Sequence, residues 1–247
     1  MDTQEFSNGF DTLVNSYRRF KDFDKKEELD SIEFNEYEKS LYLTMAQEEL
    51  AINLYNGRNP YGLAFEGTEE MRRYLDALVK TASPEEASDD PDVSDESPVA
   101  PTGVSANSSF YVLPTDIAFV VYEQVTYNDS SLGCYNGEVV AVCPVTHDEY
   151  NRLRKNPFRG VTKRRVLRLD AGEGIVELVS DYVFKDYLIR YLAKPEPIIL
   201  EDFDDDLSIN GKSEVAECAL NPILHDAILQ RAVQMALASK GIRVNNQ

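Results

Sequence analysis

The chain has few of the residues that metal, redox or disulfide chemistry requires. Its 247 residues include two histidines (His147, His225), three cysteines (Cys134, Cys143, Cys218) and no tryptophan. No two cysteines have the CxxC spacing, and neither histidine stands at a metal-ligand spacing from a cysteine or a carboxylate. This disfavours a zinc site and a disulfide framework. We expect reduced cysteines, no metal and no cofactor.

Long apolar runs and nucleotide-binding motifs are also absent. No stretch approaches the roughly 18–20 apolar residues that span a membrane, and the first six residues lack the basic and apolar regions of a secretory signal. The sequence holds no P-loop, no Rossmann fingerprint and no G-x-S-x-G elbow. Gly172-Glu-Gly174 by itself indicates a hairpin turn. We therefore expect neither a membrane partner nor an enzyme, and an enzyme of unknown type remains the third alternative.

Basic residues are scarce and unevenly distributed. The chain has 44 acidic and 25 basic residues, a formal net charge of −19. Residues 81–109 carry seven acids and no base, and residues 201–206 carry five acids in six positions. A negative chain repels phosphate, which argues against a general nucleic-acid binder. A local basic cluster can still act at short range, because salt screens fields beyond about 8 Å.

Hydrophobic periodicity predicts a helical region over residues 1–82. Phe6, Phe10, Leu13, Val14 and Tyr17 form an amphipathic stripe, and Asp30-Ser-Ile-Glu33 has the form of a capping box for a second helix. This second helix would bury Phe34, Tyr37, Leu41, Met45, Leu50 and Leu54 and end at Gly57, and Thr68 would cap a third helix. Residues 83–109 are rich in Pro, Ser, Asp and Glu and predict an acidic mobile linker.

Residues 110–200 read as a β-rich domain with one short helix. The expected strands cover 117–127, 138–143, 163–170, 175–180 and 182–192. The capping box Thr146–Glu149 starts a helix of about two turns, which Asn156-Pro157 ends. In 201–247 an acidic loop precedes a helix that starts at Asn221-Pro222. The fold class is therefore α+β: N-terminal helices and a C-terminal helix, forming one bundle, packed with a central antiparallel β-rich region.

The residue types at 206–217 match the pattern of a calcium-binding motif. Asp206, Ser208, Asn210, Gly211 and Glu217 stand at loop positions 1, 3, 5, 6 and 12 of an EF-hand. The context disagrees, because prolines precede the segment where an entering helix is needed, and a proline follows it closely. A turn between an acidic stretch and a short helix is the preferred interpretation, and a metal site is the weaker alternative.

The most distinctive segment is a run of eight basic residues without an acid. These are Arg152, Arg154, Lys155, Arg159, Lys163, Arg164, Arg165 and Arg168. They could form a solvated face, a phosphate-binding surface or a protein interface. No interleaved aromatic platform for bases is evident in the pattern, whereas the chain itself offers acidic partners at 83–96 and 201–206. A heterologous ring needs such complementary faces. We therefore prefer the interface, with DNA contact as the alternative.

Several longer segments resemble virion proteins of tailed phages. These are Tyr37–Leu50 with Leu54–Gly57, Val145–Phe158, Tyr191–Ile198 and Leu224–Val233. Together they are similar to the head-to-tail connector (neck or ring adaptor) proteins of crAss-like phages. The resemblance omits 83–109 and rests on structural rather than catalytic motifs.

The resemblance implies a structural virion protein that forms a ring in the phage neck. Such a ring would join portal to tail, follow a twelvefold (dodecamer) symmetry and continue the DNA channel. Its partners would be itself, the portal protein, neighbouring tail and neck rings, and genomic DNA passing without sequence specificity. Asp202, Asp204, Asp205 and Asp206 would serve as the acidic partner of the basic residues or line the channel. Assembly would take place in the host cytoplasm.

Overall fold

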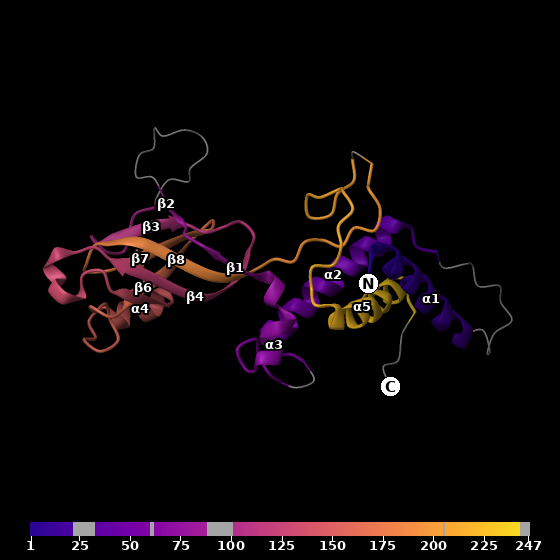
Figure 1. Cartoon of the computed structure of the whole chain (residues 1–247), viewed down its shortest axis with the longest axis horizontal. Coiled ribbons are helices and arrows are strands. Elements are labelled where there is room, and N and C mark those ends of the chain that lie inside the picture. Colours follow the sequence, from indigo (N-terminus) through magenta and orange to yellow (C-terminus); the bar gives the residue numbers. More distant parts are fainter. Residues whose placement is uncertain (22–32, 60–61, 88–100, 205, 243–247) are drawn as a thin grey trace. The chain divides into compact units, whose positions relative to one another are not determined.

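The computed structural model divides the chain into two compact units. Unit 1 comprises Met1–Leu78 and Lys194–Gln247, and unit 2 comprises Val79–Ala193 (Figure 1). The structure describes all residues except 22–32, 60–61, 88–100, 205 and 243–247. Helices dominate unit 1, and strands dominate unit 2. The predicted α+β class is therefore confirmed.

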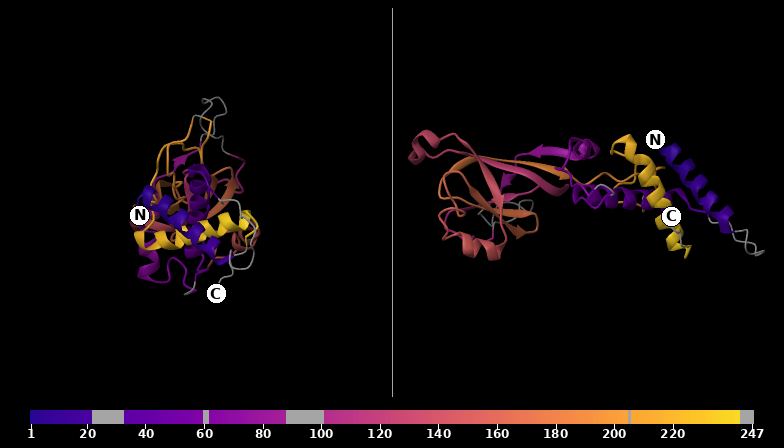
Figure 2. Two further views of the ribbon diagram at one scale, coloured as in Figure 1. Left: turned by 90° about the vertical axis from the view of Figure 1, so that its right-hand side faces the viewer. Right: turned by 90° about the horizontal axis from the view of Figure 1, so that it is seen from below.

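Unit 1 is built around three long helices, α1 (Thr3–Lys21), α2 (Glu36–Tyr55) and α5 (His225–Ser239). All three pack against one another, and α1 and α5 lie side by side (Figure 2). Shorter helices are α3 (Glu69–Tyr74), η1 (Asp76–Leu78) and η3 (Pro222–Leu224). The predicted stripe of α1 is confirmed at Phe6, Phe10 and Val14, which are buried, whereas Leu13 and Tyr17 are half-buried. The predicted caps Thr68 and Asn221 are also confirmed.

The start of α2 and its buried face differ from the prediction. Asn35 caps the helix and Glu38 completes the capping box. The expected box at 30–33 was wrong, since Glu33 is not helical and residues 30–32 lie outside the described residues. Met45, placed in the predicted apolar stripe, is 46% exposed.

The buried face of α2 is instead partly polar, because it binds the main chain of an extended segment. Ile198 N donates to Thr44 Oγ1 at 3.1 Å, and Leu200 N donates to Ser40 Oγ at 3.0 Å. Gln47 Nε2 donates to the Glu196 carbonyl at 2.6 Å. Burial of polar groups is tolerated where each finds a partner, so periodicity of apolar residues alone points to the wrong face.

Unit 2 is one eight-stranded sheet with the order β1-β8-β4-β5-β6-β7-β3-β2. Its strands are β1 (Val79–Ala82), β2 (Glu85–Glu86), β3 (Ser108–Val112), β4 (Ile117–Tyr127), β5 (Val139–Pro144), β6 (Val166–Gly172), β7 (Ile175–Val179) and β8 (Phe184–Ala193). A 3₁₀ segment, η2 (Ser130–Tyr135), follows β4, and α4 (His147–Leu153) connects β5 to β6. The predicted strand starting at 163 begins later, at Val166.

One strand changes partner along its length and turns the sheet. β5 pairs antiparallel with β4 through Val139–Ala141 and parallel with β6 through Val142–Pro144. The parallel pair departs from the expected all-antiparallel region and requires a crossover, which α4 provides. One face of the curved sheet holds a core that includes Val125, Tyr127 and Ile189. On the other face, Tyr150 of α4 packs on Leu167, Leu169 and Val179.

Both ends of the predicted linker 83–109 join the sheet. β2 pairs with β3, and Ala87 is buried. At the other end, the carboxylate of buried Glu177 accepts hydrogen bonds from Val104 N at 2.7 Å and from the Ser108 hydroxyl. The acidic centre of this segment, 88–100, lies outside the described residues. Among the helices that the structure describes, none has the length and apolar character that crossing a membrane requires.

Candidate functional site

The basic residues of the segment 152–168 lie on α4, on the turn that follows it and at the start of β6. Thr146 and Glu149 form the predicted capping box, and the helix ends at Leu153. The Asn156 side chain then organises the turn, because its Oδ1 accepts from Phe158 N at 2.9 Å and from Arg159 N at 3.2 Å. This is the local hydrogen bonding that favours Asn in turns. It holds the turn with its basic side chains outward.

Gly160 closes this turn against the end of the helix. A Cβ at this position would lie 2.8 Å from the carbonyl oxygens of both Leu153 and Asn156. Beyond it, Thr162 and Arg165 form an isolated antiparallel bridge, and the Tyr127 hydroxyl donates to the Thr162 carbonyl at 3.2 Å. The turn is therefore anchored to the sheet core and is not a loose loop.

Seven of the eight basic residues form one exposed cationic surface. We define the basic surface as Arg152, Arg154, Lys155, Arg159, Lys163, Arg164 and Arg165, which are exposed or half-exposed. Within the described part of the chain, none of the seven has a carboxylate oxygen within 4.0 Å. Their mutual repulsion is thus left to solvent or to a partner outside the described residues.

Arg168 differs from the other seven because its charge is neutralised internally. Its side chain is 11% exposed, and Nη1 donates to Glu123 Oε1 at 2.9 Å. A second ion pair joins Nη2 to Asp170 at 3.4 Å, and the Tyr187 hydroxyl donates to the same Glu123 oxygen. Although burial opposes the charge, Glu123 raises the pKa of Arg168. Arg168 therefore belongs to the interior of unit 2 and not to the basic surface.

Three residues of the basic surface, Arg152, Arg159 and Arg165, line a hollow of about 520 Å³. Apolar side chains and Cys143 form part of its lining, and three arginines contribute charge to it. The full lining is Cys143, Val145, Glu149, Arg152, Leu153, Asn156, Arg159, Arg165 and Leu167. The one acid, Glu149, accepts from Thr146 N at 3.2 Å as part of the helix cap. The hollow is suited to a group that is apolar at its centre and anionic at its edge.

Aromatic side chains also belong to this region, contrary to the sequence-based expectation. Phe158, at the apex of the turn, is 87% exposed. Lys163 Nζ lies 5.6 Å and Arg164 Cζ 5.9 Å from the ring centroid of Tyr135. Phe158 stands within the basic run, so the sequence alone could have identified it as an aromatic residue of this region. Tyr135 is distant in sequence, so the sequence alone could not have placed it there.

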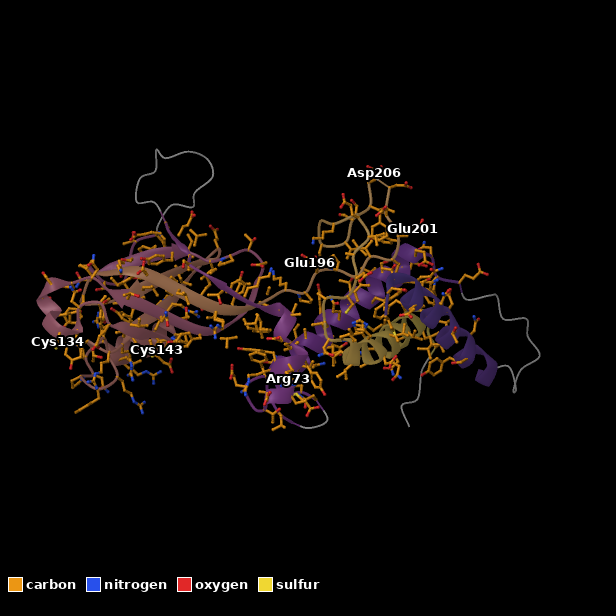
Figure 3. All side chains as sticks on the ribbon, viewed as in Figure 1. Arg73, Cys134, Cys143, Glu196, Glu201 and Asp206 are labelled. Atoms are coloured by element: carbon orange, nitrogen blue, oxygen red, sulfur yellow. The ribbon has the colours of Figure 1, made fainter. Side chains whose placement is uncertain are left out.

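The acidic residues 201–206 begin a loop that projects from unit 1 (Figure 3). We define the acidic loop as residues 201–207, of which 205 is outside the described residues. Its base is fixed: Phe203 N donates to the Ser213 carbonyl at 2.8 Å, and Val215 N donates to Asp202 Oδ1 at 2.7 Å. Asp204 and Asp206 are exposed, and neither has a basic group within 4.0 Å among the residues described.

The EF-hand-like residues form a tight turn. Asn210 and Gly211 both have positive φ, 52° and 79°, between the bridged residues Ile209 and Lys212. Such an Asn-Gly pair is typical of a two-residue reversal. Asn210 Nδ2 donates to Glu48 Oε1 at 2.9 Å, and no helix precedes the turn among the described residues of 194–209. In the described part of the chain, no cluster of three His, Cys, Asp or Glu residues could hold a metal ion.

Comparison with known proteins shows that the chain is similar to phage ring proteins. The chain is 45% identical to Ring protein 3 of Bacteroides phage crAss001 over 241 residues, which cover 97% of this chain and 96% of the relative. It is 31% identical to Ring protein 4/5 of the same phage over 248 residues, covering 97% and 93%. The sequence profile described as phage tail ring protein 3/4 matches residues 1–247. The chain therefore belongs to the phage tail ring protein 3/4 family, a group of structural virion proteins.

Proposed function

We propose that the chain forms a ring in the phage neck by head-to-tail contacts in which the basic surface of one copy meets acidic residues of the next. The observation that carries this proposal is the basic surface itself, seven cationic side chains that have no acidic partner among the described residues. In a heterologous interface each copy presents two different faces, and rotation closes the series into a ring. Here the second face would be the acidic loop of unit 1.

Electrostatics supports a role of these charges in pairing and in register. Complementary charges speed encounter and disfavour wrong partners more than they add affinity. Arg favours such contacts, because its planar guanidinium can bind a carboxylate with two parallel hydrogen bonds. The same surface would be repelled by an identical copy of itself, which disfavours a two-fold dimer through this face.

Charge reversal tests the proposed ring. We expect Arg154→Glu/Lys163→Glu/Arg164→Glu to abolish oligomers at moderate salt and to prevent incorporation of the chain into particles. Native mass spectrometry and particle composition report the two effects.

The matched control for this variant is Arg58→Glu/Arg72→Glu/Arg73→Glu. It changes the net charge equally, but on unit 1, where Arg72 and Arg73 form exposed pairs with Glu66 and Glu69 (Arg73 is labelled in Figure 3). The proposal fails if the unit 2 variant enters particles as well as this control does.

The position of the ring is a further part of the proposal. We place it between portal and tail, with twelvefold symmetry and with the DNA channel through its centre. As the alternative to the loop's role in the ring contact, exposed acids such as Asp204 and Asp206 would suit a channel wall, because negative charge lets DNA pass without adhering. Under this alternative, neutralising them together with Asp205 would leave incorporation intact and alter DNA retention or ejection, whereas the ring contact predicts impaired incorporation. Unchanged retention would remove the channel assignment.

DNA contact by the basic surface is the second candidate function, and the exposed Phe158 ring favours it. Aromatic rings beside basic side chains bind single-stranded nucleic acid by stacking on bases. In this case Phe158→Ala would weaken binding of single-stranded DNA, and the charge-reversed variant would show a smaller salt dependence. Intact oligomers in both variants would favour this function over the ring contact.

A further inference from the structure

The hollow in the basic surface and the tip of the acidic loop have complementary chemistry. The hollow has Leu153, Val145 and Leu167 in its lining, together with guanidinium groups. The loop tip presents Leu207, 44% exposed, next to Asp206 and close to Asp204. We propose that the hollow receives the acidic loop of a neighbouring copy, with Leu207 inserted against the apolar lining. This inference rests on the proposed ring and names its contact.

Among the described residues, the three arginines of the hollow have few side-chain partners. The Arg165 side chain makes one hydrogen bond there, from Nη1 to the Phe158 carbonyl at 3.4 Å, and the Arg152 side chain makes one, from Nε to the Asp148 carbonyl at 3.5 Å. Both distances are long for charged donors. Neither arginine, nor Arg159, has an acidic partner among the residues described. Carboxylates of an incoming loop would replace water on these groups.

The loop is built to present its tip. The Phe203 ring packs edge-to-face on Tyr37 with centroids 5.1 Å apart, which ties the loop base to α2. Leu207 N donates to the Asp204 carbonyl at 2.9 Å, which turns the chain at the tip. A leucine whose main chain is held by a hydrogen bond loses less conformational freedom on docking, so more of its burial contributes to affinity.

The sizes agree as well. A dry cavity of about 150 Å³ accommodates a benzene ring, and the hollow measures about 520 Å³. It therefore has room for a leucine side chain and for adjoining carboxylates. Phe158, at the edge of the same surface, would then pack beside the incoming loop and exclude water, as residues around an anchor do.

A cross-linking experiment tests the contact directly, because the hollow contains a native thiol. Cys143 lines the hollow, whereas Cys134 lies on η2 (Figure 3). We start from Cys134→Ser/Cys218→Ser and add Leu207→Cys. A short bismaleimide applied to particles that contain this chain is expected to give a ladder of covalent multimers. The ladder should disappear when Cys143 is also replaced by Ala.

Val215→Cys in the same background is the matched control. Val215 is 48% exposed and belongs to the same projecting segment, but it is hydrogen-bonded at the loop base through Asp202. It should give no ladder. The inference is overturned if Leu207→Cys gives no ladder in intact particles, or if Val215→Cys gives an equal one.

A mixing experiment separates this contact from the ring itself. Leu207→Asp removes the loop anchor, and Arg152→Glu/Arg159→Glu/Arg165→Glu removes the hollow. Each variant alone should be monomeric, with self-association weakened at least about tenfold, and their mixture should stop at 1:1 dimers. If Leu207→Asp assembles fully while charge reversal of the basic surface still prevents assembly, the loop contact is refuted and the proposed ring is retained. If neither the loop variant nor the charge-reversed variant changes assembly, the loop contact and the proposed ring are both refuted.

Discussion

Replacement of Arg168 by alanine should destabilise unit 2 far more than replacement of any residue of the basic surface. Arg168 neutralises Glu123, which is 3% exposed in the sheet interior. Without the guanidinium, the Glu123 carboxylate keeps the Tyr187 hydroxyl as its one hydrogen-bond donor of those described. Breaking a buried pair by removal of one partner costs about 3–5 kcal/mol. Arg164→Ala, at an exposed position, should change stability by less than about 0.5 kcal/mol.

The assay is thermal or urea unfolding of the two variants beside the unaltered chain. A loss of about 3–5 kcal/mol corresponds to a decrease in Tm on the order of 10 °C or more. A double variant, Glu123→Leu/Arg168→Met, removes both charges and should recover most of the loss. Recovery is expected because Arg168 Nε is buried without a hydrogen-bond partner among the described residues, so the pair is imperfectly satisfied. Equal stabilities of Arg168→Ala and Arg164→Ala would refute the reasoning.

Three further predictions follow from local geometry. Gly160→Ala places a Cβ 2.8 Å from two carbonyl oxygens and should lower the free energy of unfolding by about 1–3 kcal/mol, measured by chemical denaturation. Gly137→Ala serves for comparison, because Gly137 has positive φ and open space around it. Burial lowers the pKa of His225 below its usual 6.5. As the pH falls, the unfolded chain therefore binds this proton before the folded chain does, and the folded state should lose stability below about pH 6.5. Melting curves recorded at several pH values should show this loss for the unaltered chain, and His225→Gln should remove it. Calcium at millimolar concentration should leave the Tm unchanged, because the Asn210 region is a tight turn; a calcium-dependent rise that Asp206→Asn abolishes would contradict this.

The sequence identified the elements that depend on local chemistry. Thr146 and Glu149 cap α4, Thr68 caps α3, and Gly57 adopts φ +73° after α2, as their residue types predict. Capping side chains bond backbone groups within a few residues of themselves, and glycine permits positive φ wherever the chain needs it. Such features are readable without knowledge of the fold. The richness in β-branched and aromatic residues that predicts β4 at Ile117–Tyr127 is local in the same sense.

Other features depended on partners distant in the chain. The buried face of α2 contains Ser40, Thr44 and Gln47 because residues 196–200 bring their main chain to it. The parallel pairing of β5 with β6 likewise depends on how the sheet curves. Periodicity records which residues are apolar, and it cannot record a hydrogen-bond partner more than a hundred positions away.

The sequence by itself determined that this acidic chain carries an isolated run of eight bases, two acidic segments and, at 206–217, an EF-hand-like pattern without its helical context. The tertiary structure decided which of those bases face solvent. It placed Arg168 beside Glu123, 45 positions earlier, and gave the other seven no counter-charge among the residues that it describes. It also formed the hollow between α4 and β6 and exposed Phe158. The physical reason is that charge is fixed by composition, whereas desolvation and pairing of that charge are fixed by contacts between residues far apart in sequence.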